Sequence, residues 1–137
     1  MNGQKTKNSF KKNQQQIQKY ILIVDDSVDN QELLTLLFES IGYKVDHVSN
    51  GADALSLLSN CSIMPDLILL DYQMPVMCGQ EFRNQQLQNK SIQKIPVIVM
   101  TGDVNNNLHV EMKNPFYVMI KPLQMNELIK IVSQAVN

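Results

Sequence analysis

Residues 66–75 of the chain, DLILLDYQMP, decide the fold class, because four aliphatic side chains run straight into an aspartate. A continuous apolar run of this length is typical of a strand that helices cover on both faces. Two other stretches have the same character, YILIV at 20–24 and PVIVM at 96–100. We therefore predict that residues 66–70 form a central strand and that Asp71 follows it at the edge of the core.

Other segments complete the order of elements. KVDHV at 44–48 alternates like an edge strand, and FYVMI at 116–120 is a fifth strand. Helical spacing of apolar residues predicts helices over 27–41, 50–59, 79–89 and 125–136. Ser27 is a candidate N-cap, and Gly42 follows the end of that helix. Residues 103–114 contain three consecutive asparagines, which prefer turns, so we expect a short or mobile fourth helix. The order predicts an α/β fold with a parallel sheet and helices on both faces.

The composition limits the possible classes of protein. A chain of 137 residues with 44% hydrophobic residues suits one domain with an aliphatic core. Five of the 12 basic residues lie in the first nineteen positions, which contain no acid and few apolar residues. We predict a flexible tail at 1–19 and a domain at 20–137, with a weak basic docking arm as the alternative interpretation of the tail. The domain keeps seven basic against 13 acidic residues, which argues against nucleic-acid binding.

The sequence gives no sign of export or of membrane insertion. Its apolar runs are too short for a signal peptide, or for the roughly 20 residues of a membrane span. Cys61 and Cys78 lack the spacing of a metal site or of a disulfide framework. We predict a cytoplasmic protein with reduced cysteines and no membrane span.

Polar residues of complementary chemistry stand where the predicted strands end. They are Asp25 and Asp26 after the first strand, Asp71 after the third, Thr101 after the fourth and Lys121 after the fifth. The carboxyl ends of parallel strands meet at one edge of the sheet, where such folds bind ligands. Three close carboxylates suit Mg²⁺, which takes oxygen ligands and often binds beside phosphate. Asp71 would be the nucleophile toward phosphorus, with Lys121 offsetting charge and Thr101 donating a hydrogen bond.

Each of these residues also has an ordinary structural interpretation. The two acids after the first strand can open the next helix near its positive end, and Asp71 can cap the following turn. Thr101 can bond to backbone, and Lys121 can be a surface lysine. The occurrence of all five at successive strand ends is what favours a site. His47 and His109 stand alone, and we give neither a catalytic role.

The segments that carry these residues resemble the receiver domain of two-component response regulators. They are ILIVDDS, NGADAL, DLILLDYQMPVMCG, IPVIVMTG and IKP, and they extend over the chain from about residue 20 onward. The resemblance implies a flavodoxin-like, doubly wound sheet of five parallel strands in the order 2-1-3-4-5. SVDNQ at 27–31 and DYQMPVM at 71–77 look most like receivers of hybrid sensor kinase systems.

The resemblance also implies a role for each residue near the metal. Asp71 becomes the phospho-acceptor, and both Asp71 and Asp26 become ligands of Mg²⁺. Asp25 acts on the metal through a water molecule. The backbone carbonyl of Gln73 becomes a further ligand, so the Gln73 side chain carries no information about this role.

The remaining members of the motif have implied roles as well. Thr101 becomes the switch hydroxyl, and Lys121 becomes the lysine of the phosphorylation site. The bond between Lys121 and Pro122 is cis in the family, an isomer whose free-energy cost is low only before proline. Gly79 shapes the loop after Asp71.

The chain departs from the family pattern at three places. The family commonly has an aromatic residue three positions before the lysine, which turns inward when the switch hydroxyl engages phosphate; here that position is Val118. Tyr117 is one place off and should face the other way by strand alternation. Cys78 replaces an acid before Gly79, and the asparagine-rich segment lacks the glycine usual before the fifth strand. Switching through Thr101, Val118 and Tyr117 is therefore expected to differ from the usual form.

The functional hypothesis is a phosphoacceptor signalling module. A histidine kinase or a histidine phosphotransfer protein would phosphorylate Asp71, and an unidentified downstream protein would bind in response. We expect no enzymatic activity beyond its own phosphorylation and dephosphorylation. No output domain follows the last predicted helix, so we expect the module to act alone or to shuttle phosphate.

Three alternatives belong to other classes. A degenerate receiver would bind partners without phosphorylation, and Val118 leaves this open. A Mg²⁺-dependent phosphatase with an aspartyl nucleophile would need a second aspartate two positions after Asp71, where this chain has Gln73. A flavin-binding module would need a phosphate loop rich in Ser, Thr and Gly after the first strand, and the sequence has none there.

Overall fold

A twisted sheet of five parallel strands forms the centre of the molecule, in the order β2-β1-β3-β4-β5. The structure is a computed structural model and describes residues 17–103 and 108–137. The strands are β1 (Tyr20–Val24), β2 (Lys44–Val48), β3 (Leu67–Asp71), β4 (Val97–Thr101) and β5 (Tyr117–Ile120). The helices are α2 (Val28–Ser40), α3 (Gly51–Asn60), α4 (Gly79–Leu87), α5 (Leu108–Glu111) and α6 (Met125–Val136). The fold class and strand order that the sequence predicts are confirmed.

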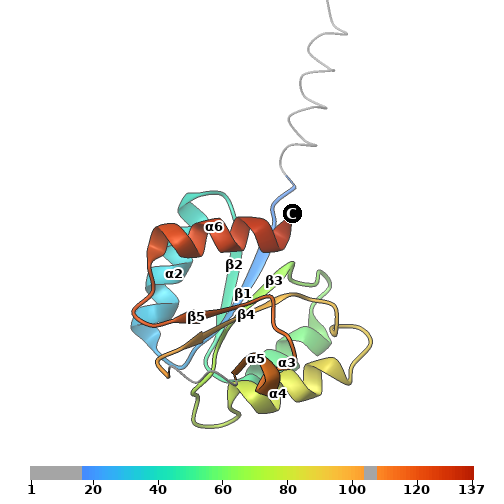
Figure 1. Cartoon of the computed structure of the whole chain (residues 1–137). Helices are drawn as coiled ribbons and strands as arrows, with labels where there is room; N and C mark the ends of the chain where they lie inside the picture. Colours follow the sequence, from blue (N-terminus) through green and yellow to red (C-terminus); the bar gives the residue numbers. More distant parts are fainter. Residues whose placement is uncertain (1–16, 104–107) are drawn as a thin grey trace, which may run out of the picture.

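The helices cover the sheet on both faces, α2 and α6 on one and α3, α4 and α5 on the other (Figure 1). Successive residues of β3 alternate between the two cores, with Leu67 and Leu69 facing α2 and α6 and Ile68 and Leu70 facing the other layer. All residues of β1, β3 and β4 are buried, whereas β2 and β5 form the edges. Burial on both faces explains why the three central strands have continuous apolar sequences.

Local signals in the sequence set the helix ends. Ser27 is the N-cap of α2, where its Oγ accepts a hydrogen bond from the backbone N–H of Asn30 at 3.3 Å. Asn50 caps α3 by accepting from the N–H of Asp53 at 2.8 Å. Gly42 follows α2 with a φ of +102°, a conformation that favours glycine. Both the Ser27 cap and the position of Gly42 were predicted from the sequence.

Two of the central strands extend one residue further than their aliphatic runs. In register, Asp71 of β3 is opposite Met100, and Thr101 of β4 is opposite Ile120, so each strand ends on a polar residue. At the other end, Asp66 lies just before β3, and its carboxylate accepts a hydrogen bond from the N–H of Tyr20 at 2.8 Å. Asp71 and Thr101 are thus part of the sheet edge itself, whereas Asp25, Asp26 and Lys121 follow their strands.

The segment predicted as a doubtful helix at 103–114 contains only the four-residue α5. Its shortness was predicted; residues 104–107, with the asparagine run, lie outside the described part, as do residues 1–16 of the predicted tail. After α5 the chain passes through Lys113 and Asn114, which have positive φ values of 54° and 55°. None of the described helices has the length and apolar character that crossing a membrane requires.

Candidate phosphoacceptor and metal site

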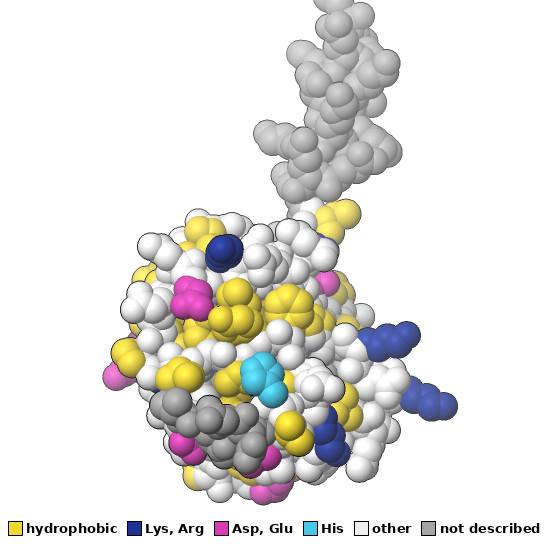
Figure 2. Space-filling model, viewed as in Figure 1, with side chains coloured by type: hydrophobic (Ala, Val, Ile, Leu, Met, Phe, Trp, Pro, Cys, Tyr) yellow, Lys and Arg dark blue, Asp and Glu magenta, His cyan; other side chains and the backbone are white. Residues whose placement is uncertain are grey.

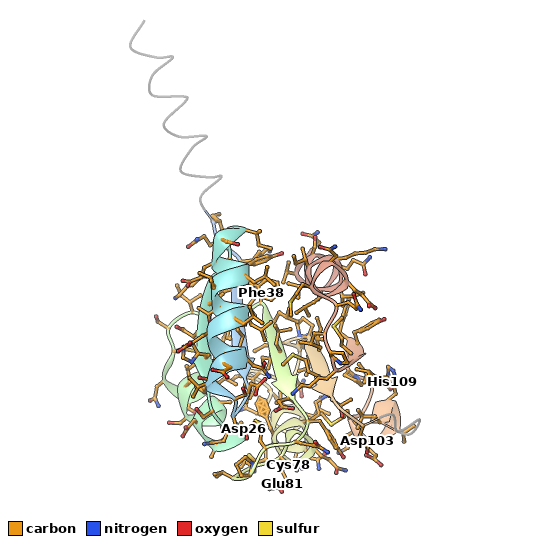
Figure 3. The ribbon with its side chains drawn as sticks, turned by 90° about the vertical axis from the view of Figure 1, so that its left-hand side faces the viewer. Asp26, Phe38, Cys78, Glu81, Asp103 and His109 are labelled. Carbon is orange, nitrogen blue, oxygen red and sulfur yellow. The ribbon has the colours of Figure 1, made fainter. Side chains whose placement is uncertain are left out.

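Three carboxylates meet at the carboxyl edge of the sheet. Asp25 and Asp26 follow β1 and Asp71 ends β3, and one oxygen from each lies within 4.8 Å of the others. The side chains of Asp25 and Asp71 are buried, whereas that of Asp26 is exposed. In Figure 3, Asp26 lies at the same end of the molecule as Cys78 and Asp103, in loops, and Glu81, in the first turn of α4. The cluster therefore has one open side toward solvent.

Asp71 is 4% exposed, and its carboxylate has two neighbouring donors. Lys121 Nζ lies 3.4 Å from Oδ1, and the N–H of Gln73 donates to the same oxygen at 3.3 Å. Burial raises the pKa of Asp71 to about 6, and the charge of Asp25 adds to this rise, while Lys121 and the Gln73 amide partly offset it. Ionising Asp71 therefore costs free energy, and a bound cation would reduce this cost.

Asp25 is held by the first turn of α2. Its Oδ1 accepts from the N–H of Ser27 at 2.9 Å, and its Oδ2 accepts from Asn30 Nδ2 at 3.3 Å. These contacts at the start of α2 agree with the structural interpretation of Asp25, and its role near a metal stays a prediction. The same hydrogen bonds fix the carboxylate whose negative charge raises the pKa of Asp71. The structural and functional interpretations do not exclude each other here.

Gln31 is a supporting residue that the sequence reasoning missed. The residue is 4% exposed, and its Nε2 lies 2.5 Å from the backbone oxygen of Asp25 and 3.1 Å from Ser49 Oγ. The amide therefore joins the end of β1 to the loop after β2, beside the metal-ligating candidates. A signal was present in the sequence: Gln31, Leu34 and Phe38 share the buried face of α2, so a polar residue stands on an apolar stripe.

Thr101 and Lys121 are connected through the backbone. The N–H of Lys121 donates to the carbonyl of Thr101 at 2.7 Å, and the Lys121-Pro122 bond is cis, as the resemblance implied. Thr101 Oγ1 is buried and accepts a hydrogen bond from the N–H of Asp103 at 3.0 Å. Thr101 thus has the backbone partner of its ordinary interpretation, and it stands at the end of the strand next to the one that carries Asp71.

Gly79 stands where the chain passes close to Asp71. An added Cβ would lie 2.9 Å from the Cα of Tyr72 and 3.0 Å from the carbonyl oxygen of Asp71. The N–H of Gly79 donates to the carbonyl of Tyr72 at 2.9 Å. The loop after Asp71 therefore closes onto its own start, which only a residue without a side chain allows.

The structure shows what surrounds the residues that depart from the family pattern. Val118 packs against the core on the α3 and α4 side, while Tyr117 packs on the opposite side, as strand alternation predicts. The hydroxyl of Tyr117 donates to Glu127 Oε1 of α6 at 3.1 Å. Cys78 precedes α4, and its Sγ lies 3.4 Å from Glu81 Oε1.

The structure brings together four of the predicted side chains, Asp25, Asp26, Asp71 and Lys121. Thr101 ends the adjacent strand, and Lys121 is half-buried rather than a free surface lysine. The role of the Gln73 carbonyl stays a prediction. His47 and His109 are exposed.

Comparisons with known proteins give the family. The family model of the response regulator receiver domain matches residues 21–133. The regulatory protein AtoC of Escherichia coli is 32% identical over 117 residues, which are 84% of this chain and 24% of AtoC. The chain spans between a tenth and a quarter of the length of the first curated relatives it matches.

Solved structures agree with this match. The signal receiver domain of a signal transduction histidine kinase from Syntrophus aciditrophicus superposes with a TM-score of 0.77 at 31% identity, covering 86% of this chain and 89% of that one. The receiver domain of a sensor histidine kinase from Pseudomonas aeruginosa, solved with a magnesium ion in its active-site cleft, has a TM-score of 0.77 at 23% identity, covering 87% and 98%. With its sheet order, its acidic cluster and this match over most of its length, the chain belongs to the response regulator receiver domain family.

Proposed function

We propose that this chain is a phosphoacceptor signalling module in which Asp71 receives a phosphoryl group. The observation that carries the proposal is the pairing of a buried Asp71 with Lys121 inside a cluster of three carboxylates. Structural ion pairs rarely gather two further acids around one buried carboxylate, because like charges repel each other there. A site that must accept a metal and a phosphoryl group needs this arrangement.

The residues present fit a magnesium ion. Carboxylate oxygens at this spacing are the ligands that Mg²⁺ prefers, and the exposed side of Asp26 leaves room for the waters that it retains. Asp26, Asp71 and the carbonyl of Gln73 would hold the ion directly, with Asp25 acting through water. The bound ion would supply positive charge next to the phosphoryl oxygens.

The chain's own residues account for the transfer. A carboxylate oxygen of Asp71 attacks phosphorus, an O–P bond forms, and the N–P bond of a phosphohistidine donor breaks and leaves its electron pair on the histidine nitrogen. Lys121 would move from its pairing with Asp71 to the phosphoryl oxygens, where charge stabilisation is needed. Thr101 would donate its hydroxyl proton to one of these oxygens.

The donor would be a histidine kinase or a histidine phosphotransfer protein. Apolar side chains of α2 lie in the open beside the site, with Val28 61% and Leu33 50% exposed. A groove lined by Leu33, Lys121, Pro122 and Met125, among others, lies between α2 and the loop before α6. An apolar rim next to the reactive carboxylate is what a docking donor protein requires.

A second surface would serve the downstream partner. Val110 of α5 is 77% exposed, and Phe116 and Ile120, at either end of β5, are 45% and 47% exposed. Figure 2 shows hydrophobic side chains gathered on one face of the molecule, viewed as in Figure 1. Exposed apolar groups in one region mark interaction surfaces, so the downstream protein would bind there. Phosphorylation would change this binding by shifting the chain between two conformations.

The experiment that tests the proposal is phosphorylation in solution. The protein is incubated with a small phosphodonor and Mg²⁺, and its intact mass is measured over time. We expect one phosphoryl adduct in the wild-type chain and none in Asp71→Asn. No adduct in the wild-type chain would favour a receiver that binds partners without phosphorylation. Multiple turnover of a phosphomonoester would favour an aspartyl phosphatase.

A further inference from the structure

A side-chain hydrogen bond connects the acceptor strand to the helix beside the proposed output face. Tyr72 follows Asp71 directly, and its hydroxyl donates to Glu111 Oε2 of α5 at 3.1 Å. The two residues are 39 positions apart, and both are half-buried. Tyr72 therefore spans the distance between the site and α5 with a single side chain.

The Tyr72 end of this connection is rigid. Its N–H donates to the carbonyl of Met100 on β4 at 2.9 Å, and its carbonyl accepts from Gly79 at 2.9 Å. The Cα of Tyr72 also lies at the place where a Cβ on Gly79 would clash. Because backbone hydrogen bonds on both sides hold the main chain of Tyr72, its side chain starts from a fixed point next to the acceptor.

The Glu111 end belongs to a weakly built helix. α5 has four residues, of which only Leu108 is buried, so its own hydrogen bonds cannot hold it in place. The turn after α5 is anchored separately by the buried Arg83, whose Nε donates to the carbonyl of Met112 at 2.9 Å. Within the described residues, Tyr72 supplies the side-chain hydrogen bond to α5 itself.

Phosphorylation would act on this region through Thr101. Thr101 Oγ1 accepts from the N–H of Asp103, which starts the connection to α5. If the Thr101 side chain turns toward a phosphoryl group, Asp103 loses this partner and the start of the connection shifts. On the described side of α5, the bond between Tyr72 and Glu111 is the side-chain contact that a displacement of this helix would have to break.

The usual aromatic reporter is absent from β5. Val118 has no polar atom with which to exchange partners, and the hydroxyl of Tyr117 is bonded to Glu127 on the other side of the sheet. Tyr72 is the aromatic residue that joins the acceptor edge to the layer containing α5. We propose that the hydrogen bond from Tyr72 to Glu111 is the tether that holds α5 in its unphosphorylated position and that phosphorylation of Asp71 breaks it.

This inference rests on the proposed function and makes Tyr72 a positioning residue. The test is the rate of backbone amide hydrogen exchange across 108–112, measured by mass spectrometry with and without phosphodonor and Mg²⁺. This rate reports how firmly α5 is held. In Tyr72→Phe we expect exchange in the unphosphorylated protein to rise roughly three- to ten-fold, the range that loss of one such hydrogen bond gives. We expect no change in the phosphorylated protein, because the tether is already broken there. Glu111→Gln keeps an acceptor and should give a smaller rise.

Tyr117→Phe is the matched control, because it removes a hydrogen bond of the same type and length on the opposite face. It should leave exchange across 108–112 unchanged. An equal rise in both phosphorylation states, or no rise, in Tyr72→Phe would overturn the tether while leaving the proposed function intact. The absence of a phosphoryl adduct in the same samples would overturn the proposed function, and the tether with it.

Discussion

The ammonium nitrogen of Lys121 lies 3.4 Å from Oδ1 of Asp71, although the two residues are fifty positions apart in the chain. Lys121 follows β5 at the edge of the sheet, and Asp71 ends the central strand. The contact brings one positive charge into a cluster of three carboxylates. It reduces the cost of ionising Asp71 without removing it, since burial and Asp25 still dominate the balance.

The first prediction concerns the titration of Asp71 in metal-free protein. Its pKa of about 6 lies above the usual value of 3.8, so the folded state binds this proton more tightly than the unfolded state does. The stability that Asp71 contributes is therefore fully present below about pH 4 and is lost as the pH rises through about 6. Carboxyl carbon NMR against pH measures the titration directly.

Two variants check the causes of this shift. Asp25→Asn should lower the pKa of Asp71, because a repelling charge is removed, and Lys121→Met should raise it, because an attracting charge is removed. A titration of Asp71 near pH 4 in the metal-free wild type would contradict the buried cluster.

The second prediction is that Mg²⁺ stabilises the protein through Asp26. A ligand at ten times its Kd stabilises the folded state by about 1.4 kcal/mol, which a thermal melt detects. Asp26→Asn should remove most of this stabilisation while changing the metal-free stability little, because its side chain is exposed. Asp29→Asn is the control, because Asp29 is an exposed acid in the first turn of α2 outside the cluster. Equal loss in both variants would point to unspecific charge screening.

The third prediction concerns Gln31. Gln31→Leu leaves the carbonyl of Asp25 and the hydroxyl of Ser49 without this amide, which should cost about 1–3 kcal/mol in the free energy of unfolding. It should also weaken Mg²⁺ binding measured by calorimetry, because the peptide that carries Asp26 loses its support. Glu32→Leu places the same side chain at the next, exposed position as a control. Unchanged Mg²⁺ affinity in Gln31→Leu would limit Gln31 to a structural role.

The fourth prediction compares Gly79, the first residue of α4, with Gly102, which follows β4. Gly79→Ala should destabilise the protein by about 1–3 kcal/mol, since its Cβ would lie 2.9 Å from backbone that cannot move freely. Gly102→Ala should cost little, because nothing lies within 4 Å of its added Cβ. Urea unfolding of both variants measures the difference. Similar costs would mean that the loop after Asp71 is less tightly closed than its hydrogen bond to Tyr72 implies.

Much of the fold could be predicted because the chain's local signals agree with it. The buried strands β1, β3 and β4 have continuous apolar sequences, and Ser27 and Gly42 mark the ends of α2 by side-chain and backbone chemistry. The order of the strands came from the resemblance, because parallel pairing joins segments that are distant in sequence. The one-residue extension of β3 and β4 was missed, since a polar side chain at the sheet edge does not prevent its backbone from pairing.

The supporting residues of the site were harder to predict. Gln31 donates to the backbone oxygens of Asp25, after β1, and Val48, in β2, and Tyr72 donates to a helix residue 39 positions away. The place of Gln31 on the apolar face of α2 indicates that it is buried but not which groups it binds, and no local pattern indicates the partner of Tyr72. Arg83 was part of a segment with weak helical patterning, yet it is buried and donates to carbonyls after α5. Such residues become visible only once the layers have been assembled.

The location of the phosphoryl group tests the central claim most directly. After phosphorylation with a small donor and Mg²⁺, borohydride reduces an aspartyl phosphate to homoserine, and peptide mass spectrometry then locates the converted residue. We predict conversion at position 71 alone, absent without phosphodonor and absent in Asp71→Asn. Conversion at Asp25 or Asp26, or no conversion in a protein that binds Mg²⁺ normally, would contradict the account.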